Sequence, residues 1–419
     1  MIAPRLSHVG EKMASPSGLR SIMEDITAST AADVGRTWLN LGIGNPAAIP
    51  EVTETWKRLT SEAVAETFAT TSCSYGGARG MPRLIEAIVG YFRLRYGWDI
   101  GPEHVVVGPG SQMLCFGAAA LFTGAGSDDR ARLLLPLTPE YTGYQAMSLT
   151  PDSVTGVGPI VVTTGPRSFR YDIDLPSVRQ QTDVGLMLLS NPSNPAGRCY
   201  PAAELEQLVD VAGMHGAPML VDNAYGAPFP AICERDIAPV QHPLLINTFS
   251  VSKAGLPGDR LGFAIGDPQY IAPLVSFLTN SILHAPQLAQ ATLARALESD
   301  ALDALVATAL RPFYADRRKF IAGLLDEHLP EDVAWRVHES DGGMFFWIWV
   351  DEEWFDDLRF YRLLRQRNVF VAPGRHFFTG ASGTAGHETR CFRMSVTPDP
   401  QTVELGIVRI GRTLRDMRA

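Results

Sequence analysis

The chain has 419 residues, of which 46% are hydrophobic and 19% charged, values typical of a globular protein large enough for two domains. Its net charge of −9 argues against nucleic acid or an anionic membrane as a partner. The five cysteines lack CxxC spacing and the nine histidines lack an HExxH motif, so we expect reduced thiols, a cytoplasmic protein and no metal site.

The N-terminal residues show no sign of export. Residues 1–16 contain no apolar run of the kind found in a signal peptide. The most apolar stretch of the chain, residues 113–126, is too short and too interrupted by glycine to cross a bilayer. We therefore expect neither a signal peptide nor a membrane partner.

Short apolar runs alternate with helix-forming segments through the first part of the chain. The runs are residues 104–108, 132–137, 184–190, 218–222 and 243–249, and helical segments follow at 111–122 and 205–216. Continuous apolar strands between helices are typical of a mostly parallel sheet that is buried on both faces. We therefore predict an α/β fold with a mostly parallel central sheet sandwiched by helices.

The last third of the chain has a different pattern. Residues 268–329 are rich in helix formers, the stretches 335–350, 368–378 and 391–398 are typical of strands, and residues 403–417 form an amphipathic pattern. This predicts a smaller α+β domain, with the opening segment up to about residue 55 packed near it. The expected division is a large domain over 56–310 and a small domain made of 1–55 and 311–419.

Polar residues follow the predicted strands, and in open parallel sheets ligands collect beyond the carboxyl ends of the strands. Gly110 allows close approach of a ligand to the backbone, and the free N–H groups of Ser111 and Gln112 at a helix start suit an anion. A Gly-Ser helix start is also an ordinary cap. In the next motif, PEYTGY, Tyr141 offers an aromatic face, whereas we expect Tyr144 to be an ordinary half-buried tyrosine.

Three later motifs complete this polar set. NPSNPAG holds Asn194 in a loop constrained by two prolines, and DNAYG places Asp222 and Tyr225 after a buried strand. A carboxylate there is costly unless it meets a cation. In SVSKAGLPGDRLG, a serine and an arginine suited to a phosphate, Ser250 and Arg260, flank a lysine, Lys253.

One crevice with these groups fits pyridoxal 5′-phosphate (PLP). Its phosphate needs donors, its pyridinium nitrogen needs an anion, and its aldehyde needs an amine. Taken singly, Lys253 could equally be a solvated lysine on a turn and Asp222 a helix cap. The number and order of the motifs favour the cofactor.

The motifs YxxxxG, GSQ, PEY, NPSNPAG, DNAYG, SVSK and PGDRLG resemble those of the fold-type I, PLP-dependent class I and II aminotransferases over nearly the whole chain. In closer detail the chain resembles the valine–pyruvate aminotransferase family, at residues 17–26, 41–51, 139–144, 222–230, 252–260 and 391–398. Lys253 and Arg260 are seven residues apart, where many aminotransferases have eight, but the valine–pyruvate-like branch also has seven.

The resemblance implies a role for each matching residue on the cofactor. Lys253 forms the Schiff base and moves the proton between substrate and cofactor, and Asp222 keeps the pyridine nitrogen protonated. Asn194 and Tyr225 bond the 3′ oxygen of the cofactor. Tyr141 stacks on the ring. The phosphate cup consists of Gly110, Ser111, Gln112, Ser250 and Arg260.

The resemblance also implies residues for the substrate and for a second subunit. Arg393 grips the substrate α-carboxylate as a fork. Gly44 and Asn194 contact the substrate as well. Tyr75 reaches the phosphate bound by the neighbouring subunit, which implies a homodimer with shared active sites.

The activity implied is transfer of an amino group, via a Lys253 aldimine, between a small aliphatic L-amino acid (valine or alanine type) and a 2-oxo acid such as pyruvate or 2-oxoisovalerate. The motifs contain no second arginine for a distal carboxylate, although Arg20, Arg79 and Arg375 lie near them. The alternative is a PLP-dependent lyase or β/γ-replacement enzyme of secondary metabolism, because the cofactor motifs are shared.

Two other classes fit the sequence less well. A DNA-binding regulator with an aminotransferase-like domain would need a basic domain before that part, but the chain is acidic and the likeness begins by residue 17. A nicotinamide enzyme would need a GxGxxG motif after a first strand, with an acidic residue downstream, and the chain has none.

Overall fold

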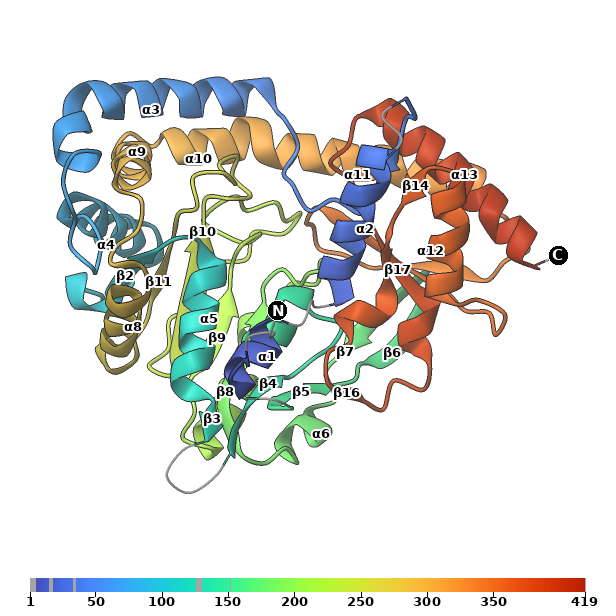
Figure 1. Ribbon diagram of the computed structural model, residues 1–419, viewed down its shortest axis with the longest axis horizontal. Helices are drawn as coiled ribbons and strands as arrows, with labels where there is room; N and C mark the ends of the chain where they lie inside the picture. The colour runs from blue at the N-terminus through green and yellow to red at the C-terminus, as the bar shows by residue number, and fades with distance from the viewer. Residues whose placement is uncertain (1–4, 15–17, 33–34, 126–129, 151, 419) are drawn as a thin grey trace.

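The computed structural model describes residues 5–14, 18–32, 35–125, 130–150 and 152–418, and it confirms the predicted α/β architecture (Figure 1). Its large sheet has the strand order β16-β5-β4-β8-β9-β10-β11-β2, with β3 paired to β4. The strands are β2 Val105–Gly108, β3 Gly124–Ala125, β4 Arg130–Leu135, β5 Val154–Val157, β8 Val184–Ser190, β9 Met219–Asp222, β10 Leu245–Ser250, β11 Gly262–Ile265 and β16 Ala381–Ser382. Neighbours from β16 to β10 pair in parallel, whereas β11 is antiparallel to both of its neighbours.

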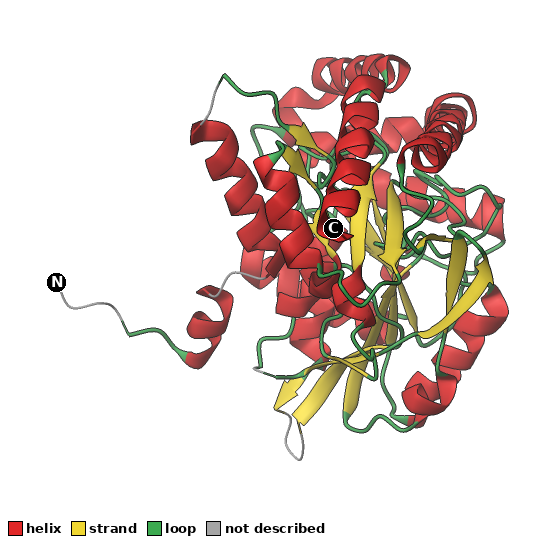
Figure 2. Cartoon of the chain, turned by 90° about the vertical axis from the view of Figure 1, so that its right-hand side faces the viewer, coloured by secondary structure: helices red, strands yellow, loops and turns green. Residues whose placement is uncertain are grey.

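Both faces of this sheet are buried because successive residues of each strand point to opposite sides. In β8, Leu186 and Leu188 belong to one apolar cluster, while Met187 and Leu189 belong to another. The first cluster includes helices α5 Ser111–Phe122 and α8 Pro268–Ile282, and the second includes α7 Ala202–Met214. Helices α3 Pro50–Thr71, α4 Pro82–Tyr96 and α9 Gln287–Glu298 pack together beside the β2 end of the sheet. Figure 2 shows the strands enclosed between helices.

A second sheet forms a smaller region with the order β15-β17-β13-β12-β7-β6. Its strands are β6 Ile160–Gly165, β7 Ser168–Asp172, β12 Trp335–His338, β13 Phe345–Val350, β15 Ala372–Pro373 and β17 Cys391–Ser395. Helices α11 Arg311–His328, α12 Asp357–Gln366 and α13 Pro400–Arg418 lie in the same region (Figure 1). The N-terminal segment packs there as predicted, since β1 Leu39–Asn40 pairs with β14 Val369–Phe370.

The stretches 335–350 and 368–378 were each predicted as one strand, which is wrong. Residues 335–350 form two antiparallel strands, β12 and β13, joined by a loop with two glycines. The stretch 368–378 is also divided. It forms β14 and β15, which belong to different sheets, followed by a 3₁₀ turn over Gly374–Phe377. Proline has no N–H for a sheet ladder and is confined to sheet edges, and Pro373 lies in the edge strand β15. Two residues, Val369 and Phe370, pair with β1, and the chain then crosses to pair Ala372 and Pro373 with β17.

The two regions are joined by more than one segment. Helix α10 Ala301–Leu305, a π-helical turn over Val306–Leu310 and α11 form one continuous helical run from the large to the small region (Figure 1). Strands β6 and β7 lie within the range 56–310 but pair into the small sheet. The division into 56–310 and 1–55 with 311–419 stays a prediction.

Three further helices are α1 His8–Ala14, α2 Gly18–Ala32 and α6 Leu175–Arg179, and 3₁₀ turns lie at Pro102–His104, Thr142–Ala146 and His387–Arg390. Ile22 and Ile26 of α2 pack against Tyr361 and Phe370 of the small region. Within the described ranges no helix has the length and apolar character of a membrane span, and no group of three or more metal-ligating side chains is found.

Candidate active site

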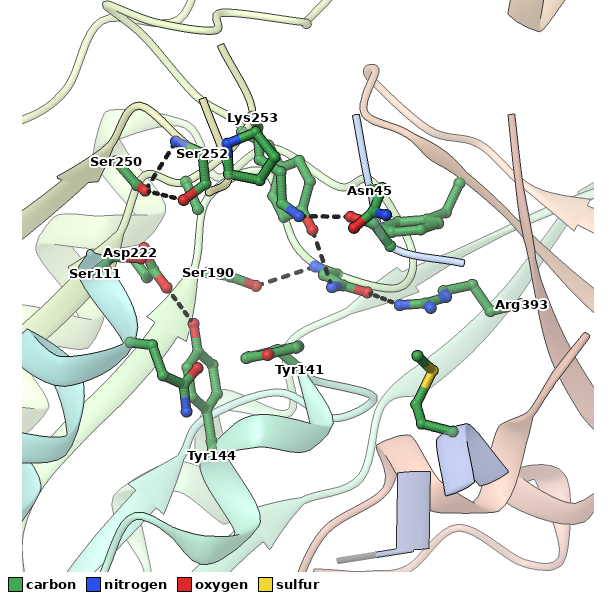
Figure 3. A pocket seen from close by; sticks show the side chains of 18 of the residues that line it. Asn45, Ser111, Tyr141, Tyr144, Ser190, Asp222, Ser250, Ser252, Lys253 and Arg393 are labelled. Carbon is green, nitrogen blue, oxygen red and sulfur yellow. Dashed lines mark hydrogen bonds between the residues drawn. The ribbon is translucent and has the colours of Figure 1, made fainter. Parts of the chain in front are cut away.

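A cavity of about 420 Å³ lies where the carboxyl ends of β8, β9 and β10 face the small region (Figure 3). All of the predicted site residues except Gly110 and Tyr75 line it: Gly44, Ser111, Gln112, Tyr141, Asn194, Asp222, Tyr225, Ser250, Lys253, Arg260 and Arg393. The parallel strands explain this grouping, because their carboxyl ends meet at one edge of the sheet.

One end of the cavity is rich in hydrogen-bond donors. Ser250 Oγ lies 3.0 Å from Ser252 Oγ, and Arg260 donates to Ser252 Oγ at 3.2 Å. Gly110 lies next to Arg260: a Cβ there would lie 2.7 Å from Arg260 Nη2, so the guanidinium would have to shift, and the φ of +85° at this position also favours glycine. Ser111 begins α5, whose first N–H groups have no partner within the helix. Hydroxyls, a guanidinium and free N–H groups together suit a phosphate.

A buried carboxylate, Asp222, lies at the base of the cavity. It accepts a hydrogen bond from the Tyr144 hydroxyl at 3.0 Å (Figure 3) and another from the Thr248 hydroxyl at 3.1 Å. Burial raises the pKa of Asp222, and these hydrogen bonds oppose that shift. The expectation for Tyr144 was wrong: it is fully buried and holds the carboxylate, because the turn after Tyr141 directs it under the cavity.

The lysine follows β10 and meets the N-terminal segment. Lys253 Nζ donates to the carbonyl oxygen of Gly44 at 2.6 Å and lies 5.7 Å from the ring centroid of Tyr225. Burial lowers the pKa of Lys253 to about 8, and the positive charges of Arg393 and Arg260 act in the same direction. A neutral amine is therefore readily available at mildly alkaline pH.

A second buried cation, Arg393, faces the same cavity from β17. It is 3% exposed and donates to Asn194 Oδ1 at 2.9 Å and to the Gly42 carbonyl at 3.1 Å. Its guanidinium lies 3.9 Å from the ring centroid of Phe345, and its Nε has no hydrogen-bond partner. Burial lowers the pKa of Arg393 to about 10, so it stays charged at neutral pH. Since no described carboxylate pairs with it, it is ready for an anionic ligand.

Asn194 connects the two cavity ends. Its backbone N–H donates to Ser190 Oγ at 3.0 Å, and its side-chain amide donates to the Tyr225 hydroxyl at 3.3 Å while accepting from Arg393. A phenol and an amide are thereby held side by side above the strand ends.

The remaining predicted residues lie away from the cavity. Tyr75 is 87% exposed and contacts the ring of His284, so its predicted role in a neighbouring subunit stays a prediction. Arg79 donates to backbone carbonyls and Arg375 binds carboxylates of α12, so neither faces the cavity. The side chain of Arg20 lies outside the described part.

Several lining residues were missed by the sequence interpretation: Met23, Gly42, Asn45, Tyr144, Ser190, Ala224, Ser252, Pro257 and Phe345. Ser252 stands inside the SVSK motif and was visible there. Met23 on α2 lies within the stretch 17–26 but was not singled out there, and Phe345 at the start of β13 lies outside the motifs. The packing of the two regions brings both to the cavity.

The residues present fit PLP. A half-buried amine without a carboxylate partner, a buried carboxylate, an aromatic side chain and a donor-rich end line one cavity. The space kept free by Gly110 beside Arg260 is consistent with a bound phosphate.

Comparison with known proteins gives concordant results. Residues 36–410 match the family model described as aminotransferase class I and II. The valine–pyruvate aminotransferase of Escherichia coli K12 is 31% identical over 400 residues, 95% of each chain. A Psychrobacter arcticum 273-4 protein, provisionally classed as an amino-acid aminotransferase, has a solved structure with a TM-score of 0.94 at 28% identity, covering 99% of both chains. The valine–pyruvate aminotransferase AvtA of Salmonella typhimurium LT2 has a TM-score of 0.86 at 28% identity, covering 96% of this chain and 99% of AvtA.

Proposed function

The chain belongs to the class I and II aminotransferases, and we propose that it transfers the amino group of a small aliphatic L-amino acid, of valine or alanine type, to a 2-oxo acid such as pyruvate or 2-oxoisovalerate. The cofactor of this aminotransferase is PLP. The similarity to a valine–pyruvate aminotransferase over almost the whole chain supports this substrate pair.

The positions of the charged side chains around the cavity are the main support for a substrate with one carboxylate and a neutral side chain. The cations among its described lining residues are Lys253, Arg260 and Arg393. The first two belong to the cofactor end, which leaves Arg393 for the α-carboxylate. A substrate with a second carboxylate would need a further cation, whereas Met23 and Phe345 offer apolar surface. This supports a neutral aliphatic side chain.

PLP, when bound, provides the electron sink that stabilises negative charge at the substrate Cα. Lys253 would hold it covalently and then take and return the proton at Cα, for which its amine must be neutral. The lowered pKa of Lys253, about 8, makes this form accessible. Asp222 would accept the N–H of the pyridine ring, with Tyr144 and Thr248 fixing its orientation.

Arg393 would bind the substrate carboxylate through its two-pronged guanidinium. The Phe345 ring beneath the guanidinium and the Gly42 carbonyl hold it in place. Asn194 joins this group to Tyr225, so substrate and cofactor share one hydrogen-bonded network. The network orients the substrate Cα toward Lys253.

A homodimer belongs to this proposal, with Tyr75 of one protomer completing the phosphate end of the other. The support is the aromatic side chain of Tyr75, which is 87% exposed and contacts the ring of His284. Sedimentation analysis tests the assembly. Loss of PLP affinity in Tyr75→Ala, with the dimer intact, tests the shared site.

The substrate proposal is tested by chromatography of reaction products. L-valine and pyruvate should give 2-oxoisovalerate and alanine, with aspartate and glutamate as poor donors. Preference for a dicarboxylic donor would contradict the charge argument. Release of a β-leaving group from a substrate such as β-chloroalanine, without any transamination of valine or alanine, would favour a lyase.

A further inference from the structure

A buried carboxylate that does not line the cavity, Glu140, lies directly behind it. Its side chain is 1% exposed and receives three hydrogen bonds. The Ser190 N–H donates to Oε1 at 2.8 Å, the Ser190 hydroxyl donates to Oε2 at 2.7 Å, and the Tyr141 N–H donates to Oε2 at 2.8 Å. The proposed reaction uses none of these bonds directly.

Both partners of Glu140 lead to residues on the cofactor side. Tyr141 is the ring expected to stack on the cofactor. Ser190 is the last residue of β8, and its hydroxyl accepts the N–H of Asn194 at 3.0 Å. Asn194 in turn contacts Tyr225 and Arg393. One carboxylate thus binds the backbone of Tyr141 and, through the Ser190 hydroxyl, the backbone of Asn194.

We propose that Glu140 is a positioning residue that sets the orientation of Tyr141 and Asn194 toward the cofactor. The proposal rests on the proposed function, because these two residues are assigned to the cofactor there. Glu140 is the second residue of the PEYTGY motif, and the sequence interpretation gave it no role.

The hydrogen-bond pattern favours the charged form of this carboxyl, because two of its three partners are backbone N–H groups that can only donate. The third partner, the Ser190 hydroxyl, donates to a charged Oε2 and accepts from a protonated one. Burial raises the pKa of Glu140 to about 8, with a small contribution from Asp222, while the bonds from Ser190 and Tyr141 lower it. Tyr144 and Tyr200 are the other titratable neighbours whose pKa values Glu140 raises. A buried carboxyl is costly in either form unless its three bonds are made, which ties the backbone of both neighbours to one geometry.

The test is Glu140→Gln in the holoenzyme, with Asp357→Asn as the matched control. Asp357 is also a fully buried carboxylate, but it binds Arg375 and does not line the cavity. The readouts are the PLP dissociation constant of the apoprotein, the pH midpoint of the visible absorption of bound cofactor, kcat and KM, and thermal unfolding.

In Glu140→Gln we expect PLP to bind about tenfold more weakly and kcat to fall about tenfold, the usual scale for residues behind a ligand shell. The pH midpoint should rise, because Asn194, the proposed donor to the cofactor's charged 3′ oxygen, is misplaced. Asp357→Asn should lower the unfolding temperature without changing these values.

Ser190→Ala keeps Glu140 and its two backbone hydrogen bonds but removes the hydroxyl that joins it to Asn194. It replaces Glu140→Gln as the test if that variant does not fold. It should also raise the pH midpoint. An unchanged midpoint and PLP affinity in the folded variants would overturn the proposal and leave Glu140 a purely structural residue. Wild-type protein that binds PLP but transfers no amino group would contradict the proposed function alone. The role of Glu140 could then still be tested through the PLP dissociation constant and the pH midpoint of the cofactor absorption.

Discussion

The two ends of the cavity are built in different ways. At the cofactor end, Asp222, Ser250 and Lys253 lie at or just after the last residues of neighbouring strands in one sheet. At the substrate end, Arg393 comes from the second sheet and Gly44 comes from the N-terminal segment. One sheet is enough to assemble the first group, whereas the second exists only when two regions pack together.

Two contacts hold the ends together. Lys253 donates to the Gly44 carbonyl, and Arg393 donates to the Asn194 side chain (Figure 3). The comparison therefore predicts that substitutions at the cofactor end change cofactor binding or chemistry, and that those at the substrate end change KM.

The largest effect is expected at the lysine. Lys253→Ala removes the group that moves the proton, so kcat should fall at least about 10²–10⁴-fold. The protein should still bind PLP non-covalently, because Ser250, Ser252 and Arg260 remain. Rapid-reaction kinetics and dialysis measure the two effects. Lys319→Ala, at an exposed lysine outside the cavity, is the control. Activity close to wild type in Lys253→Ala would contradict the assignment of Lys253 as the group that moves the proton.

The next effect separates the two ends. Arg393→Gln should raise KM for the amino acid by about 100-fold, because loss of one partner of a buried charge pair costs about 2–5 kcal/mol. PLP affinity should stay nearly unchanged. Steady-state kinetics and cofactor titration check this, with the exposed Arg412→Gln as control. An equal loss of PLP affinity would mean that the ends do not act separately.

A smaller effect, on kcat, is expected for Tyr144, which binds Asp222 at the base of the cavity. Tyr144→Phe keeps the packing against Tyr141 but removes a hydrogen bond to Asp222, a bond to a charged group worth about 1.5–3 kcal/mol. We expect kcat to fall about tenfold and KM for the amino acid to stay nearly constant. A change confined to KM would place Tyr144 in the substrate end instead.

The smallest expected effect is electrostatic: the charge of Arg393 at the substrate end influences the pKa of Lys253 at the cofactor end. The rate at which the apoprotein captures PLP should rise as pH passes about 8, because the neutral amine of Lys253 is the reactive form. The positive charge of Arg393 lowers this pKa, so Arg393→Gln should move the midpoint to higher pH. Stopped-flow absorbance across a pH series measures it. A midpoint that moves downward would contradict the sign of the coupling.

The sequence predicts the cofactor end better than the substrate end, for a physical reason. Asp222, Asn194 and Lys253 follow apolar strands directly, so the pattern of strands and polar residues predicts their meeting place. Met23 and Phe345 reach the cavity through packing between regions, so the resemblance over residues 17–26 did not identify Met23 as a lining residue, and no motif indicated Phe345.

The fold shows the same limit. The runs that became β8, β9 and β10 were recognisable from continuous apolar residues, whereas α3 and α4 had no place in the prediction. Tyr144 was taken for an ordinary residue, because a turn decides whether it points to solvent or to Asp222. Glu140 gave no signal, since burial and not sequence makes its carboxylate unusual.

Transamination itself is tested most directly by the visible spectrum of the purified holoenzyme. L-valine or L-alanine is added without any oxo acid, and pyruvate follows. The account predicts that the yellow band of bound PLP is lost with the amino acid and restored by pyruvate. A band that persists through turnover, or a protein that never becomes yellow even with added PLP, would contradict it.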